Sequence, residues 1–135
     1  MDDLNDLERG IIVGLLIGEG HFGFDGRRPQ IVVRMHVRHE PLLRWLQRLF
    51  PRGALYGPYH RDGRHWMQWM ARGPALVCDL LPAIEPVLQT RVDPHVLERL
   101  ERMKTFSRRY MAEVREREVG VAHYRPPREK LTPVW

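Results

Sequence analysis

Apolar residues dominate the first patterned stretch of the chain, and glycine interrupts them at regular intervals. Residues 10–20 read Gly-Ile-Ile-Val-Gly-Leu-Leu-Ile-Gly-Glu-Gly. Gly10, Gly14 and Gly18 fall on one stripe of a helix that we expect from about Leu7. Each glycine weakens a helix by about 0.5 to 1 kcal/mol relative to alanine, so the close approach of a second helix should compensate. The run is far shorter than the ~20 residues that span a bilayer, which favours a helix pair in water over a membrane helix.

Two later stretches alternate between apolar and polar residues, with Val32 as an exception on the polar side, which predicts two β-hairpins. The first spans Phe22 to Arg38 around a turn at 25–29, and the second spans 54–72 around the Asp-Gly turn at 61–64. Each hairpin has one apolar face and one polar, arginine-rich face. The candidates on or beside the polar face are Arg27, Gln30, Arg34, His36 and Arg38 in the first hairpin, and Tyr56, His60, Arg64, Trp66, Gln68 and Arg72 in the second.

Helical spacing accounts for the remaining patterned segments. Residues 40–50 have the period of an amphipathic helix, and a third helix should start at 73–74 and break near Pro82 or Pro86. Asp93 is the N-cap predicted for a last helix that runs to about residue 119, as Asp6 is for the first. Because prolines gather after residue 120, we expect one domain over 1–119 and a tail over 120–135 that is poorly ordered or lies on a partner.

Charge adds a partner class to this picture. The chain carries 22 lysines and arginines against 17 acidic residues, a formal charge of +5, and most of its cations are arginines suited to phosphate and guanine contacts. The single cysteine, Cys78, excludes an internal disulfide and a cysteine-cluster zinc site. The acidic N-terminus lacks a secretory signal, so we expect the cytoplasm, or an organellar matrix in a eukaryote, with no secretion and no membrane partner.

The order helix, hairpin, helix, hairpin, helix, together with the end of the first helix, resembles the LAGLIDADG homing endonuclease family. The motif occupies residues 12–20 here, and Gly18-Glu19-Gly20 is its most specific part. Ile17 departs from the motif, at a position where the family's name has its first aspartate and which is not the metal-binding acid. The resemblance covers about residues 7–95 and implies an α+β fold, αββαββα, with a saddle-shaped antiparallel sheet. Here an extra C-terminal helix follows.

The family resemblance also implies roles for particular residues. Glu19 corresponds to the essential acid and, with the Gly18 carbonyl, would hold Mg²⁺ or Mn²⁺. Arg91 matches a basic residue often found near the active site, and His39 matches a polar residue that orients solvent. A single motif implies a homodimer whose first helices pair through Gly10, Gly14, Leu15 and Gly18.

Three functional hypotheses follow. The first is a homodimeric, magnesium-dependent endonuclease that binds its polar strands in the major groove of a near-palindromic double-stranded DNA site. The second is a non-cleaving protein of the same fold, an RNA-splicing cofactor or DNA-binding regulator, for which Ile17 and Arg91 are the grounds. The third is a small α/β protein whose basic face meets another acidic partner.

Overall fold

The computed structural model describes residues 4–120, which form an α+β fold with one four-stranded antiparallel sheet. The predicted αββαββα order, followed by further C-terminal helix, is confirmed. The elements are α1 (Asp6–Glu19), β1 (Gly20–Asp25), β2 (Arg28–His36), the 3₁₀ turn η1 (Val37–His39), α2 (Glu40–Leu49), β3 (Ala54–Arg61), β4 (Arg64–Arg72), the π-helical η2 (Ala75–Leu80), α3 (Leu81–Leu88), α4 (Pro94–Phe106) and α5 (Arg108–Gly120). The predicted tail lies outside the described residues from 121 onward.

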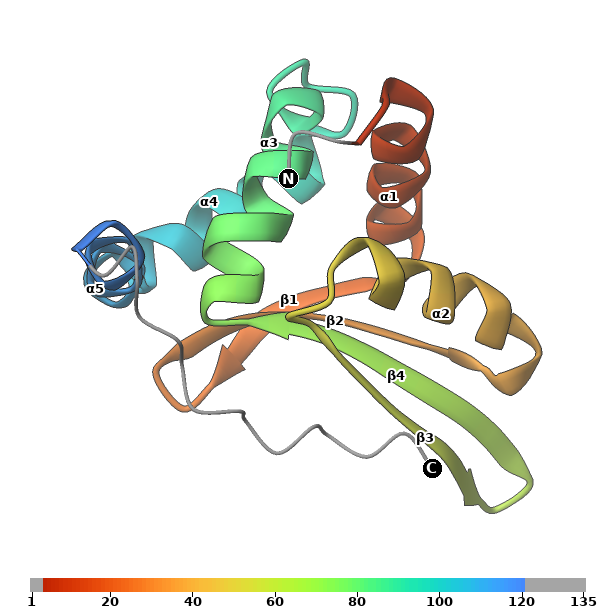
Figure 1. Ribbon diagram of the computed structural model, residues 1–135. Helices are drawn as coiled ribbons and strands as arrows, with labels where there is room; N and C mark the ends of the chain where they lie inside the picture. The colour runs from red at the N-terminus through yellow and green to blue at the C-terminus, as the bar shows by residue number, and fades with distance from the viewer. Residues whose placement is uncertain (1–3, 121–135) are drawn as a thin grey trace.

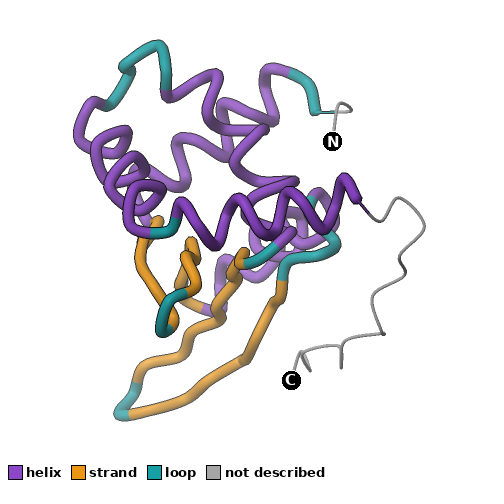
Figure 2. Tube along the Cα trace, turned by 90° about the vertical axis from the view of Figure 1, so that its left-hand side faces the viewer, coloured by secondary structure: helices purple, strands orange, loops and turns teal. Residues whose placement is uncertain are grey.

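The sheet has the strand order β1-β2-β4-β3, so β2 and β4 are central and β1 and β3 are edges. The helices lie on one face of the sheet, and no described helix covers the other face (Figures 1 and 2). Strand register explains the division, because Val33 lies opposite Trp69 and both side chains are fully buried under the helices. Their neighbours Arg34 and Gln68 pair on the opposite face. We call this uncovered surface the open face.

Three boundaries differ from the sequence predictions. β2 ends at His36, and Arg38 therefore lies in the 3₁₀ turn η1 instead of on the strand. The irregular segment of the third helix is η2, just before Pro82, and α3 continues through Pro86. Pro82 fits the first turn of α3 because a backbone N–H has no intrahelical partner there. The last predicted helix divides at Ser107 into α4 and α5.

Helix length and polarity also bear on membranes. Over residues 4–120, none of the helices combines the length and the apolar character that crossing a bilayer requires.

Candidate functional site

Helix α1 runs from the outer edge of the helical layer down to the sheet (Figure 1). Asn5 is its N-cap in place of the predicted Asp6, since the Asn5 side chain accepts from the backbone N–H of Glu8 at 2.8 Å and the Glu8 carboxylate accepts from the Asn5 backbone N–H at 3.0 Å. The inner face of the helix, with Ile12 and Leu16, is buried in the core. This packing fixes the direction in which the helix end points.

Gly20 joins α1 to β1 without an intervening loop. Its backbone N–H donates to the Leu16 carbonyl, and a Cβ atom built on Gly20 would lie only 2.6 Å from that same oxygen. Any larger residue at position 20 would force the backbone to shift, because the atom that it meets is backbone. The last glycine of the Gly-Glu-Gly sequence is therefore explained within one protomer.

The glycine stripe faces the other way. A Cβ atom placed on Gly10, Gly14 or Gly18 would meet no described atom within 4 Å, beyond the helix's own nearby backbone. Ile11 and Ile17 lie on the same side and are 43% and 37% exposed. The predicted interface residues thus form an outward apolar strip along α1, with Leu15 half-buried at its border.

Glu19 is exposed at the last position of α1. The last turn holds no basic residue, and Glu19 makes no ion pair or side-chain hydrogen bond with the rest of residues 4–120. A carboxylate at this end of a helix lies beside the negative end of the macrodipole, where a cation is favoured. Within the same residues no three His, Cys, Asp or Glu side chains gather as a metal site. One protomer thus offers a single carboxylate, with the Gly18 carbonyl one residue before it.

Several of the predicted DNA-binding residues come together on the open face. Gly20 lies opposite Val33, so the end of α1 is level with Val33 and Arg34 of β2. Gln30 pairs with Arg72, Arg34 with Gln68, and His36 with Trp66, while Tyr56 of β3 lies opposite Gln68, and Arg64 lies near the second hairpin turn.

Other predicted residues lie elsewhere. Arg27 is in the turn between β1 and β2, and Arg38 is in η1. His60 lies opposite His65, which shares the strand parity of the buried Met67, so His60 belongs to the helix-side face beyond the core. The two-residue turn and the strand bulge between residues 56 and 59 change the parity that simple alternation had assigned.

Polar contacts organise the open face. Arg72 pairs with Asp25 at 3.0 Å between Nη1 and Oδ2, and Tyr59 stacks on Trp66 with ring centroids 5.5 Å apart. The sequence prediction omitted Asp25 and Tyr59, although Asp25 alternates with the apolar residues of β1 and could have been found from that signal. The Asp25 carboxylate partly neutralises this corner of an otherwise basic face.

His36 accepts hydrogen bonds at Nδ1 from the backbone N–H and the Nε–H of Arg38, at 3.0 and 3.3 Å. Partial desolvation first, and the Arg38 charge second, lower the pKa of His36 below its usual 6.5. Both effects favour the neutral imidazole.

The two predicted catalytic helpers, His39 and Arg91, lie in different places relative to Glu19. His39 is exposed at the end of η1, six residues beyond the strand partner of Gly20. Arg91 lies in the turn after α3 with a left-handed φ of 61°. Figure 1 shows residues 89–93 beside the start of α1, whereas Glu19 is at its other end. The 14 residues of α1 separate the two levels by roughly 21 Å.

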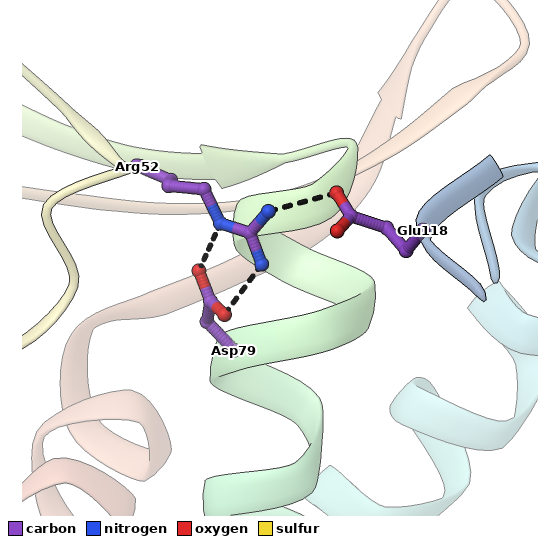
Figure 3. Close-up of polar contacts among 3 residues, drawn as sticks. All are labelled: Arg52, Asp79 and Glu118. Carbon is purple, nitrogen blue, oxygen red and sulfur yellow. Dashed lines mark hydrogen bonds and ion pairs between the residues drawn. The ribbon is translucent and has the colours of Figure 1, made fainter. Parts of the chain in front are cut away.

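Arg52 forms ion pairs with two carboxylates at once (Figure 3). Its Nε and Nη2 donate to the two carboxylate oxygens of Asp79, each at 2.8 Å, and Nη1 donates to Glu118 at 2.8 Å. Asp79 belongs to η2 and Glu118 to α5, so the contact ties α5 to the core. The pKa of Arg52 is raised, chiefly by its hydrogen bond to Asp79. Burial raises the pKa of the neighbouring Cys78 thiol, which fits a packing role.

Solved structures resemble the chain along most of its length, and two of them serve as examples. The first is the homing endonuclease I-TnaI, 19% identical, with 94% of this chain and 95% of that chain covered and a TM-score of 0.48. The second is the homing endonuclease I-CvuI in complex with its target in the presence of 2 mM Ca, 14% identical, with coverage of 88% and 97% and a TM-score of 0.43. Both are homing endonucleases, the class that the sequence motif resembles. No family model and no curated protein matches the chain.

Proposed function

We propose that the chain is one protomer of a homodimeric, metal-dependent endonuclease of the LAGLIDADG type that cuts near-palindromic double-stranded DNA. The observation that carries the proposal is the outward glycine strip of α1, which ends at an exposed carboxylate without a partner in the described protomer. Residues 1–119 are the proposed functional domain.

The glycines need a partner outside the described protomer. Three glycines in one helix weaken it by roughly 1.5 to 3 kcal/mol relative to alanine, and no described atom approaches Gly10, Gly14 or Gly18 closely enough to require their small size. A second copy of α1 packed along a two-fold axis would use that space and would cover Ile11 and Ile17. The same symmetry would set two Glu19 carboxylates side by side.

The donor set at the helix end fits a hard divalent cation. Carboxylate and carbonyl oxygens are the ligands that Mg²⁺ prefers, and Glu19 with the Gly18 carbonyl supplies one of each per protomer. Bound cations would supply an activated water and would stabilise the leaving oxygen of a phosphodiester. Glu19 itself has no competing cation among residues 4–120, so its charge is available to a metal. Mg²⁺ or Mn²⁺ is the proposed cofactor.

The open face supplies the DNA contact. Antiparallel β-ribbons enter the major groove, and this face carries arginine, glutamine, histidine and tyrosine side chains in register across three strands. Two such faces related by a two-fold axis match a near-palindromic site.

The decisive experiment is cleavage of a plasmid library of sites, with and without EDTA. We expect metal-dependent double-strand cuts, and we expect Glu19→Gln to lower the cutting rate about a hundredfold or more because the metal loses its anionic ligand. Glu116→Gln is the matched control, since Glu116 is an exposed carboxylate on α5. Undiminished cutting by Glu19→Gln would rule out the proposed site.

One observation favours the non-cleaving alternative, an RNA-splicing cofactor or DNA-binding regulator. Arg91, the predicted basic helper, lies in the turn after α3, and Figure 1 shows this turn beside the start of α1, whereas Glu19 is the last residue of α1. Salt-dependent, sequence-selective binding without strand scission at any metal concentration would support this alternative.

A further inference from the structure

Three polar side chains lie in one row across the middle of the open face. Arg34 on β2 pairs in register with Gln68 on β4, and Gln68 pairs with Tyr56 on β3. Arg34 is exposed, whereas Gln68 and Tyr56 are half-buried. A ligand can therefore reach the row, while Gln68 at its centre is flanked by Arg34 and Tyr56.

Arg34 and Gln68 form a forked contact. The Nε–H and an Nη2–H of Arg34 donate to Gln68 Oε1 at 3.1 and 2.8 Å. A guanidinium has donors only, so the Gln68 atom that faces it must be the amide oxygen. Both lone pairs of that oxygen are engaged, and the Gln68 NH₂ group must point away from Arg34.

This arrangement changes what glutamine can read. A free glutamine pairs with adenine by accepting from N6–H and donating to N7, and this requires its oxygen. In the fork, Gln68 has only N–H donors to offer, and so has Arg34. A surface of donors matches a base edge of acceptors. In the major groove, guanine presents two adjacent acceptors, N7 and O6.

We propose that Arg34 and Gln68 act as one donor-only unit that selects guanine at a single position of each half-site and prevents Gln68 from selecting adenine. This inference rests on the proposed DNA-binding function of the open face. If Arg34 and Gln68 acted independently, Arg34 would instead select guanine and Gln68 would select adenine at a neighbouring position. Phosphate oxygens also accept from N–H donors, so a phosphate grip is the outcome against which the test is designed.

The test is a binding selection from randomised duplexes in EDTA, in which bound DNA is not cut. For the wild type we expect guanine at one position per half-site and no adenine preference beside it. Arg34→Met frees the Gln68 oxygen, so we expect the preferred base to change to adenine, with a discrimination of about tenfold or more. Arg72→Met is the matched control, since it removes another paired arginine of the open face and should leave the base at this position unchanged.

Each outcome decides the matter. A guanine beside an adenine in the wild type, or an Arg34→Met protein that binds all sequences more weakly without a change of base, would overturn the inference. A nuclear magnetic resonance measurement reports on the fork without DNA, because Arg34→Met should increase the mobility of the Gln68 side-chain amide. If no duplex is retained, the proposed function fails and guanine selection fails with it. If the wild-type protein binds DNA but Arg34→Met leaves the mobility of the Gln68 side-chain amide unchanged, only the fork is refuted.

Discussion

Arg52 and Arg34 use the same planar guanidinium group for different purposes. Arg52 donates to two carboxylates, Asp79 and Glu118, that belong to separate helices, and all its contacts serve to hold the protomer together. Arg34 donates twice to one neutral amide oxygen, and within residues 4–120 its other N–H groups have no hydrogen-bond partner. The difference teaches that the chemistry of the partner decides whether an arginine is used up inside the fold or remains available for recognition.

The glycines divide in the same way. Gly20 is required by an atom of its own protomer, the Leu16 carbonyl oxygen. Gly14 has open space around it and no described atom that demands its small size. Substitution of Gly20, which the protomer itself requires, should lower the free energy of unfolding. Substitution of Gly14, which the protomer does not require, should instead weaken the association of two protomers.

The largest stability effect should come from Arg52→Ala. The substitution leaves the Asp79 side chain, only 11% exposed, without its bidentate partner, and it removes the ionic link between η2 and α5. We expect the free energy of unfolding to fall by about 2 kcal/mol, less than for a fully buried ion pair because Arg52 is partly exposed. Urea denaturation measures this change, and hydrogen exchange should show reduced protection in α5.

The matched control for Arg52 is Arg102→Ala. Among the described residues Arg102 pairs only with the exposed Glu98 one helical turn away, at 2.7 Å, so the change should stay within about 0.5 kcal/mol. Equal effects of the two substitutions would show that the Arg52 contact adds no more than a surface ion pair.

The next effect separates Gly20 from Gly14. Gly20→Ala forces a methyl group against the Leu16 carbonyl, which we expect to lower the free energy of unfolding by about 1 to 2 kcal/mol. Gly14→Ala should stabilise the dilute protomer by up to about 1 kcal/mol and weaken the dimer. Urea denaturation at low protein concentration and sedimentation equilibrium measure the two quantities. A Gly14→Ala protein that dimerises as the wild type does would contradict the proposed helix pair.

Much of the fold was accessible from the sequence because the period of a strand shows which of its residues face the core. Alternation predicted both hairpins and put Arg34 and Gln68 on the same face, but their pairing joins β2 and β4, which are not consecutive strands, and alternation alone does not fix that register. The parity of His60 was mispredicted because a bulge in β3 shifts the alternation, and the Gly57-Pro58 pair at that bulge was the signal that could have announced it.

The position of Arg91 could not be predicted for a different reason. A motif places residues along the chain, but the direction of α3 against α1 depends on packing of both helices on the sheet. Arg9 of α1 donates to the Ala83 carbonyl of α3 at 3.2 Å, so the first turns of α1 are bonded to α3. The turn after α3, which holds Arg91, therefore lies beside the start of α1 and not beside Glu19 at its end (Figure 1). The place of Glu19 at the end of α1 could be predicted because its glycine neighbours mark the helix end, while its role stays a prediction.

The smallest effect concerns His36 at the edge of the open face. Its pKa is lowered, so a nuclear magnetic resonance titration should give a midpoint below 6.5, and Arg38→Met should raise that midpoint by removing a nearby charge and an Nε–H donor to Nδ1. Between the folded midpoint and 6.5 the unfolded chain binds more protons at this site than the folded one. The contribution of His36 therefore makes the fold slightly less stable as the pH falls through that window. A midpoint at or above 6.5, or one that Arg38→Met does not raise, would contradict this account. It would show that Arg38 does not disfavour protonation of His36, which could then donate from both ring nitrogens like any exposed histidine.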